Sequence, residues 1–378
     1  MTQFDRPSRR RALFRLVALA AAERVALAGQ QPRLAPQAHK VVLVTIGGIR
    51  LRESFSPEGL VNIPRLSGDM APRALFFPHV RNEGVTSHFN TISSILSGTW
   101  QHVDDWGREP PNQPTLFNYF QQQLAAPPSE TWVVTSNKAL TSNIGVGANV
   151  ILSKQLLIEA VERIVLGYSA RQKLHRELLL EELTAVMQDD YERVGWRLPS
   201  VSSIHDPEVK KTLLTALANF INGPDSPTSG DELTCMIAME VLRRISPSLM
   251  MVNFSDVEAA HNGTYSLHLA GIRRTDGLVL RLWEFIESLP QYAGRTTFVV
   301  MPEFGRDPDG STSNGFFNHR SNTDTNRLVW MMVLGEAVRK PGVVEREILQ
   351  TDVAPTLATW LRVECRRATG GVVPEFAV

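Results

Sequence analysis

Residues 248–263 read SLMMVNFSDVEAAHNG, and residues 296–307 read TTFVVMPEFGRD. Each segment begins with a continuous apolar run, which is typical of a strand buried on both faces of a parallel sheet. Acidic residues follow each run. Because the carboxyl ends of parallel strands lie at one edge of a sheet, where open α/β folds bind their ligands, the two segments predict a functional site at that edge.

Candidate metal ligands follow these two strands. Asp256 and Glu258 come after the first, and His261 lies three residues beyond Glu258. Glu303 ends the second, and His319 lies in a loop rich in glycine and asparagine. Carboxylates and imidazoles suit zinc, manganese or iron. The sequence therefore predicts a divalent metal, zinc in the first place with manganese or calcium as alternatives. The E-x-x-H spacing favours Glu258, which leaves Asp256 as a ligand, a cap or a group that orients a ligand.

These assignments have structural alternatives. An acid and His261 also fit a helix cap and a surface histidine, and Glu303 also fits a salt bridge to Arg306. His268 falls within a predicted helix, so we assign it a structural role.

Residues 85–91, VTSHFNT, lie between a strand-like segment and a helix that we expect to end at Gly98. A hydroxyl at a helix N-terminus suits phosphoryl or sulfuryl chemistry, because the exposed N–H groups stabilise anions. Thr86 and Thr91 are therefore candidate nucleophiles, with N-capping as the open alternative. Arg50, after the first strand, fits either a group that binds an anionic oxygen or a surface arginine.

Strand and helix patterns alternate along the chain, which predicts a mostly parallel α/β sheet with helices on both faces. Between about 152 and 246 helical periodicity replaces the alternation, and we expect a helical insertion there within a domain that spans 37–378. The expected strands are 40–46, 132–135, 249–254, 297–301 and 328–334, and the expected helices include 62–66, 90–96, 114–123 and 267–288.

Composition excludes several classes of protein. The formal net charge of zero argues against a general nucleic-acid or anionic-membrane surface, which needs an excess of basic residues. Cys235 and Cys365 are too few for a disulfide framework or a cysteine-type zinc site. We expect two free thiols, with one disulfide as the alternative.

The N-terminal residues 1–36 differ from the rest. Residues 8–11 read SRRR, and an apolar segment with charged interruptions follows over 13–29. This pattern predicts either a twin-arginine export signal, and hence a periplasmic or secreted protein, or a basic amphipathic helix on a cytoplasmic one. No later stretch is apolar enough for a transmembrane helix.

At these motifs the chain resembles the alkaline phosphatase superfamily, which includes sulfatases and phosphodiesterases. The resemblance covers about 40–363 apart from the helical insertion. The motifs occur in family order: VVLVTIGGIR at 41–50, VNIPRLSGDM at 61–70, TSHFNTISSILSG at 86–98, DVEAAHNG at 256–263, TTFVVMPEFG at 296–305, NHRS at 318–321 and LQTDVAPTLATWLRV at 349–363.

The resemblance implies an α/β sandwich with two metal ions that hydrolyses small anionic esters. For one metal, Asp256 or Glu258 with His261 and His319 matches the family set. For the other, the family has a strand-end Asp, a nucleophile, a second Asp and a histidine. This chain has instead Gly47, His88, Glu303 and Phe304.

Three explanations of this second set stay open. His88 and Glu303 form a remodelled metal site, or Thr86 or Thr91 is the nucleophile, or the second site is lost. We predict a metal-dependent hydrolase of phosphate or sulfate esters, with Arg50 on an equatorial oxygen. The alternative is a catalytically degenerate protein that binds an anionic ligand or a protein partner. The sequence predicts no oligomeric state.

Overall fold

The computed structural model describes residues 39–105, 107–137, 140, 144, 148–157, 159, 204, 206–221, 227, 229–310 and 315–378. The N-terminal segment 1–36, with its expected export signal, lies outside the described residues, and so does the stretch 160–203 of the expected insertion.

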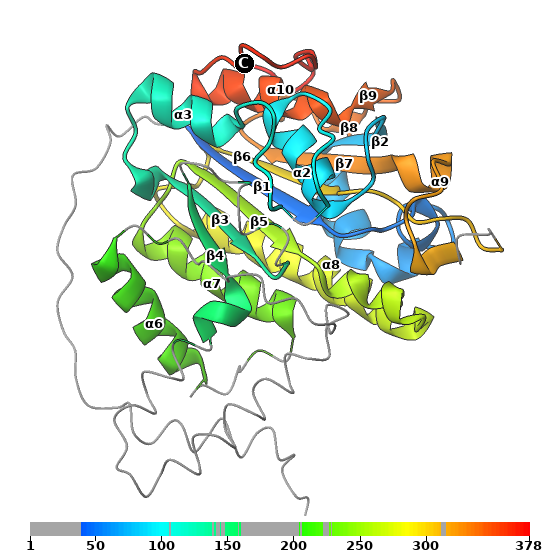
Figure 1. Cartoon of the computed structure of the whole chain (residues 1–378), viewed down its shortest axis with the longest axis horizontal. Coiled ribbons are helices and arrows are strands. Elements are labelled where there is room, and N and C mark those ends of the chain that lie inside the picture. Colours follow the sequence, from blue (N-terminus) through cyan, green and yellow to red (C-terminus); the bar gives the residue numbers. More distant parts are fainter. Residues whose placement is uncertain are drawn as a thin grey trace, which may run out of the picture.

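Within the described residues, nine strands form one sheet in the order β4-β3-β5-β1-β6-β7-β2-β8, and β9 pairs with β2 (Figure 1). The central strand β1 is parallel to both β5 and β6, whereas β7 is antiparallel to β6 and β2. The sheet is therefore mostly parallel, as the alternation of patterns predicts. The strands are β1 Lys40–Ile46, β2 Leu75–Arg81, β3 Thr131–Thr135, β4 Asn149–Leu152, β5 Leu249–Phe254, β6 Thr296–Pro302, β7 Leu328–Gly335, β8 Gly342–Val343 and β9 Ile348–Leu349.

Helices cover both faces of the sheet (Figure 1). Alternate residues of a strand point to opposite faces, so Val42 and Val44 of β1 pack into a core with α6, α7 and α8, while Val41 and Leu43 pack with α2, α3 and α10. The α-helices are α2 His88–Ser97, α3 Leu116–Leu124, α6 Pro207–Ile221, α7 Gly230–Arg244, α8 Tyr265–Ser288, α9 Asp324–Arg327 and α10 Val353–Leu361.

Several local expectations are confirmed. Helix α2 ends at Gly98, whose φ of 70° is the left-handed conformation that glycine adopts without strain. Cys235 and Cys365 are free thiols. Helix α7 lies in the segment expected as an insertion, and it packs directly against β5 and α8, while the insertion itself stays a prediction.

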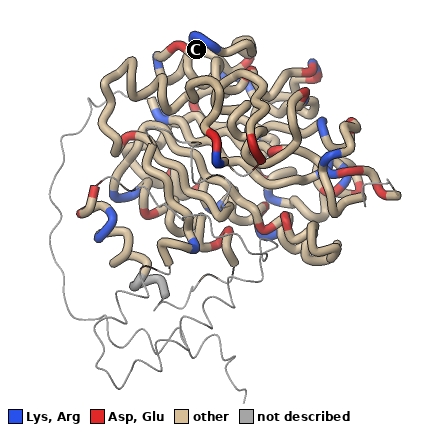
Figure 2. Tube along the Cα trace, in the orientation of Figure 1, with Lys and Arg blue, Asp and Glu red and all other residues tan. Residues whose placement is uncertain are grey.

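Two further features bear on partners. Lys and Arg residues are interspersed with Asp and Glu residues along the described trace (Figure 2), in keeping with a net charge of zero. Among the described residues, no helix combines the length and the apolar character that crossing a bilayer requires.

Candidate metal centre

Four side chains meet at the carboxyl edge of the sheet. They are His88, Glu258, His261 and His319, which we call the His/Glu cluster, and one ligand atom from each lies within 4.8 Å of the others. His88 is the first residue of α2, Glu258 and His261 belong to the 3₁₀-helix η8 that follows β5, and His319 lies in the loop after β6. The fold thus joins segments that are far apart in the sequence.

The geometry of η8, Asp256–Asn262, separates the two acids that follow β5. A 3₁₀-helix has three residues per turn, so Glu258 and His261 share one face, and the Glu258 Oε2 to His261 Nε2 distance is 3.0 Å. Asp256 lies on another face. Its Oδ2 accepts a hydrogen bond from Arg274 at 2.8 Å, and its Oδ1 accepts the main-chain N–H of Asp231 at 3.3 Å. The structure therefore brings Glu258 into the cluster and leaves Asp256 outside it.

The Glu258 carboxylate is fully buried and held from two sides. Its Oε1 accepts the main-chain N–H of Gly48 at 2.6 Å. Its Oε2 lies 2.6 Å from Arg306 Nη2 and 3.5 Å from His88 Nε2. Burial alone would raise the pKa of Glu258, but Arg306 and His88 hold this pKa well below its usual value. Glu258 is therefore a carboxylate anion.

His319 is oriented with a lone pair toward the cluster. Its Nδ1 lies 2.6 Å from the carbonyl oxygen of Thr86, which can only accept, so Nδ1 carries the proton. Nε2 then holds the lone pair, 3.2 Å from Nε2 of His261. The Phe304 ring stacks on the imidazole at a centroid distance of 4.1 Å. Burial lowers the pKa of His319 and of His261, so both are neutral, the form in which histidine binds metals.

His88 is anchored by the second acid. Its Nδ1 lies 2.7 Å from Oε2 of Glu303, and Asn253 donates to the other Glu303 oxygen at 2.6 Å. Burial alone would lower the pKa of His88, but Glu303 and Glu258 outweigh it and raise this pKa to about 10. Glu303 thus touches the cluster through His88, the arrangement in which a carboxylate orients a metal-binding imidazole.

The donor set fits a divalent metal. His88 Nε2 is buried and has no hydrogen-bond partner among the described residues, and its nearest acceptor is Glu258 Oε2 at 3.5 Å. Buried polar atoms of this kind are costly unless an ion or a proton satisfies them. Three imidazoles and one carboxylate are ligands that zinc accepts in tetrahedral sites.

The remaining candidates lie around the cluster. The Thr86 hydroxyl donates to the carbonyl of His319 at 2.5 Å, and the Thr91 hydroxyl donates to the carbonyl of Val85 at 3.1 Å. Arg50 is buried rather than on the surface, and it is paired with Glu53 at 2.5 Å and Asp309 at 2.8 Å.

Arg306 and Asn253 also lie at the site, although the sequence analysis does not place either of them there. Arg306 pairs with Glu258. The alternative interpretation of the sequence was a salt bridge between Arg306 and Glu303. Asn253 holds Glu303 from β5, and a polar residue in an otherwise apolar strand was the available signal.

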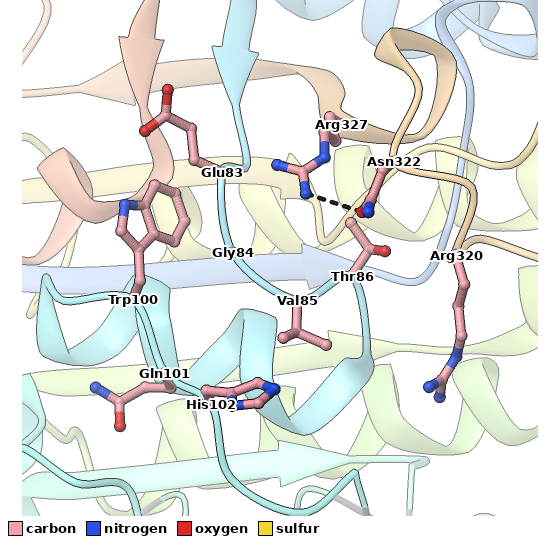
Figure 3. Close-up of a pocket in the computed structure, with 10 residues that line it drawn as sticks. All are labelled: Glu83, Gly84, Val85, Thr86, Trp100, Gln101, His102, Arg320, Asn322 and Arg327. Atoms are coloured by element: carbon pink, nitrogen blue, oxygen red, sulfur yellow. Dashed lines mark hydrogen bonds between the residues drawn. The ribbon is translucent and has the colours of Figure 1, made fainter.

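A pocket of about 430 Å³ adjoins the cluster (Figure 3). Thr86 connects the two, because it lines the pocket and its carbonyl binds His319. Arg327 lies beside Asn322 and donates to its Oδ1 at 2.8 Å, whereas Arg320 pairs with Asp105. The lining residues are Glu83, Gly84, Val85, Thr86, Trp100, Gln101, His102, Arg320, Asn322 and Arg327.

No protein-family model and no curated protein matches the sequence. Solved structures do match the fold. The alkaline phosphatase PafA has 11% identity and a TM-score of 0.56 over 92% of this chain and 100% of that one. The fold is that of the alkaline phosphatase superfamily. The 2-O GAG sulfatase BT1596 matches with 12% identity and a TM-score of 0.55 over 89% of this chain and 73% of that one. A phosphonate monoester hydrolase from Silicibacter pomeroyi matches with 13% identity and a TM-score of 0.57 over 89% and 76%.

Within this alkaline phosphatase fold, the space next to Gly47 is already filled. A Cβ built on Gly47 would overlap Oε1 of Glu258 and lie 2.9 Å from Cγ2 of Val257. The Glu258 carboxylate therefore occupies the room that a side chain at position 47 would need.

Proposed function

We propose that the protein is a metal-dependent hydrolase of phosphate or sulfate esters. The observation that carries the proposal is the His/Glu cluster itself, four ligand atoms within 4.8 Å at the carboxyl edge of an alkaline-phosphatase-like sheet. A divalent metal, zinc in the first place, would act there as a Lewis acid on an ester oxygen or lower the pKa of a bound water.

The surrounding residues would hold the four ligands in place. The Thr86 carbonyl fixes the tautomer of His319, and Glu303 fixes the orientation of His88. Rigid support of this kind keeps ligand atoms within reach of one ion and raises the basicity of the imidazoles.

We propose water as the nucleophile. The hydroxyls of Thr86 and Thr91 both donate to main-chain carbonyls, and His88 stands where the resemblance expects a nucleophile. Solvent reaches the cluster at His261, whose side chain is 20% exposed, whereas Glu258 is fully buried.

The pocket beside Thr86 is our proposed substrate site. Arg327 donates to two neutral oxygens, those of Asn82 and Asn322, so its charge is available to an anionic substrate. Trp100 adds an aromatic side chain to the lining, where part of the organic group can pack. Export through the N-terminal segment stays a prediction.

The test is metal content and ester hydrolysis of purified protein. We expect zinc by mass spectrometry and turnover of p-nitrophenyl phosphate or p-nitrophenyl sulfate. His319→Ala should lose both. The matched control is His79→Ala, because His79 is 44% exposed and lies 3.8 Å from Glu345, away from the cluster. Equal activity in His319→Ala and the wild type would refute the proposed centre.

One observation favours the second candidate, a protein that binds an anion or a partner without catalysis. The carboxylates of Glu258 and Glu303 already face two cations, Arg306 and a protonated His88. Absence of bound zinc, manganese and calcium after reconstitution, together with no ester turnover, would favour this candidate.

A further inference from the structure

Arg306 lies at the candidate metal centre, yet it carries a positive charge. Its side chain is fully buried. Its Nη2 lies 2.6 Å from Glu258 Oε2, the same oxygen that faces His261 and His88. A guanidinium at that distance occupies one of the directions from which a metal ion would reach the oxygen.

The guanidinium is fixed in this position by the main chain. Its Nε donates to the Gly48 carbonyl at 2.9 Å, and its Nη1 donates to the Phe316 carbonyl at 3.2 Å. Gly48 also donates its N–H to Glu258 at 2.6 Å, so one residue binds both partners of the ion pair. A Cβ at Gly47 would overlap the carboxylate, so the pair requires glycine there.

We propose that Arg306 is a built-in competitor of the metal: it shares Glu258 Oε2 with the ion, limits the centre to one divalent cation per chain and lowers the affinity for that cation. The inference rests on the proposed function, because it concerns the same centre. It goes further in giving the stoichiometry and the residue that sets the affinity.

Two consequences separate this role from a merely structural one. A structural arginine, once removed, would loosen Glu258 and weaken metal binding. When a competing cation is removed, the buried Glu258 carboxylate keeps less positive charge around it and attracts the metal ion more strongly, so metal binding tightens. The sign of the change therefore decides between the two roles.

The test is zinc titration by calorimetry on metal-free wild type and Arg306→Met, with zinc content by mass spectrometry. Methionine keeps a long side chain and removes the charge. We expect one zinc per wild-type chain, and in Arg306→Met a dissociation constant at least about tenfold lower, or a second zinc. The rise in melting temperature on zinc addition should also be larger in Arg306→Met.

The matched control is Arg274→Met. Arg274 pairs with Asp256 at 2.8 Å, the same kind of ion pair on another face of η8. Its removal should leave the affinity for zinc unchanged. Two zinc ions per wild-type chain would overturn the proposal, and so would weaker or unchanged zinc binding in Arg306→Met.

A buried carboxylate without its partner endangers folding, so a second pair of variants is needed. Glu258→Gln with Arg306→Met removes both buried charges and should fold. Compared with Glu258→Gln alone, the double variant should bind zinc more tightly, because it lacks the repelling charge. Equal or weaker binding would overturn the inference. If the wild type binds no zinc, manganese or calcium, the proposed function itself fails; metal binding with the wrong sign in the variants rejects only the role of Arg306.

Discussion

The ion pair between His88 and Glu303 makes a sharp prediction for the metal-free protein. The pKa of His88 is about 10 in the folded chain and 6.5 in the unfolded one. A group whose pKa is raised on folding stabilises the protein fully below its unfolded pKa, and this stabilisation is lost as the pH rises through the folded pKa. The contribution of His88 to the unfolding free energy is about 4–5 kcal/mol at pH 6 and falls below ~1 kcal/mol at pH 10.

Glu303→Gln should remove only part of that stabilisation. Glu258 also raises the pKa of His88, so the two acids share the effect. Burial raises the pKa of Glu303, and the cost of burying this charge offsets some of its attraction for His88. The glutamine can still accept from Asn253 and donate to a neutral His88. We therefore expect a loss of about 2 kcal/mol in unfolding free energy at pH 6 that shrinks above pH 9.

The assay is urea denaturation of metal-free protein at pH 6, 8 and 10. Glu336→Gln is the control, because Glu336 holds His39 at a similar 2.8 Å but has a side chain that is 43% exposed. That variant should change stability by less than about 1 kcal/mol. A loss in Glu303→Gln that is the same at pH 6 and pH 10 would refute the charge-based reasoning.

Three further predictions follow from single contacts. Gly47→Ala should displace Glu258 and weaken zinc binding at least about tenfold in a calorimetric titration; unchanged affinity would contradict the close packing. Asp276→Ala should cost about 1–3 kcal/mol in urea denaturation, because Asp276 accepts two main-chain N–H groups at the start of the π-helix Arg65–Met70, and a loss near zero would speak against this cap. Arg327→Gln should raise KM about tenfold with little change in kcat, more than Arg320→Gln does, and equal effects would argue against substrate binding at Arg327.

The fold was largely predictable because its central strands are continuous apolar runs. Segments such as 249–254 and 296–302 leave little choice other than a buried parallel strand. Strand β4, Asn149–Leu152, was missed because four residues carry too weak a pattern. The antiparallel direction of β7 was also beyond the sequence, since an apolar run does not reveal its direction.

The arrangement of the candidate site was predictable where neighbouring residues in the sequence determine it, but not where the packing of distant segments determines it. The E-x-x-H spacing favours Glu258 over Asp256, and a 3₁₀-helix with three residues per turn gives that result. No local pattern reveals that Arg306 turns back to Gly48 and Glu258, because the contact with Gly48 spans 258 positions of the chain. Long-range contacts of buried charges depend on the complete fold.

The residues that depart from the pattern of the resembled superfamily are linked to one another by direct contacts. A side chain at Gly47 is excluded because Glu258 fills its space, and Glu258 is held there by Gly48 and Arg306. Two carboxylates, one guanidinium and one protonated His88 sum to zero charge, so these four side chains are neutral as a group inside a low-dielectric interior. A divalent ion adds two positive charges, and His88 offsets one of them when it gives up its proton, as a ligand must. Metal binding at this centre should therefore tighten with rising pH. A purely structural cluster would instead keep its balanced ion pairs and bind no metal at any pH.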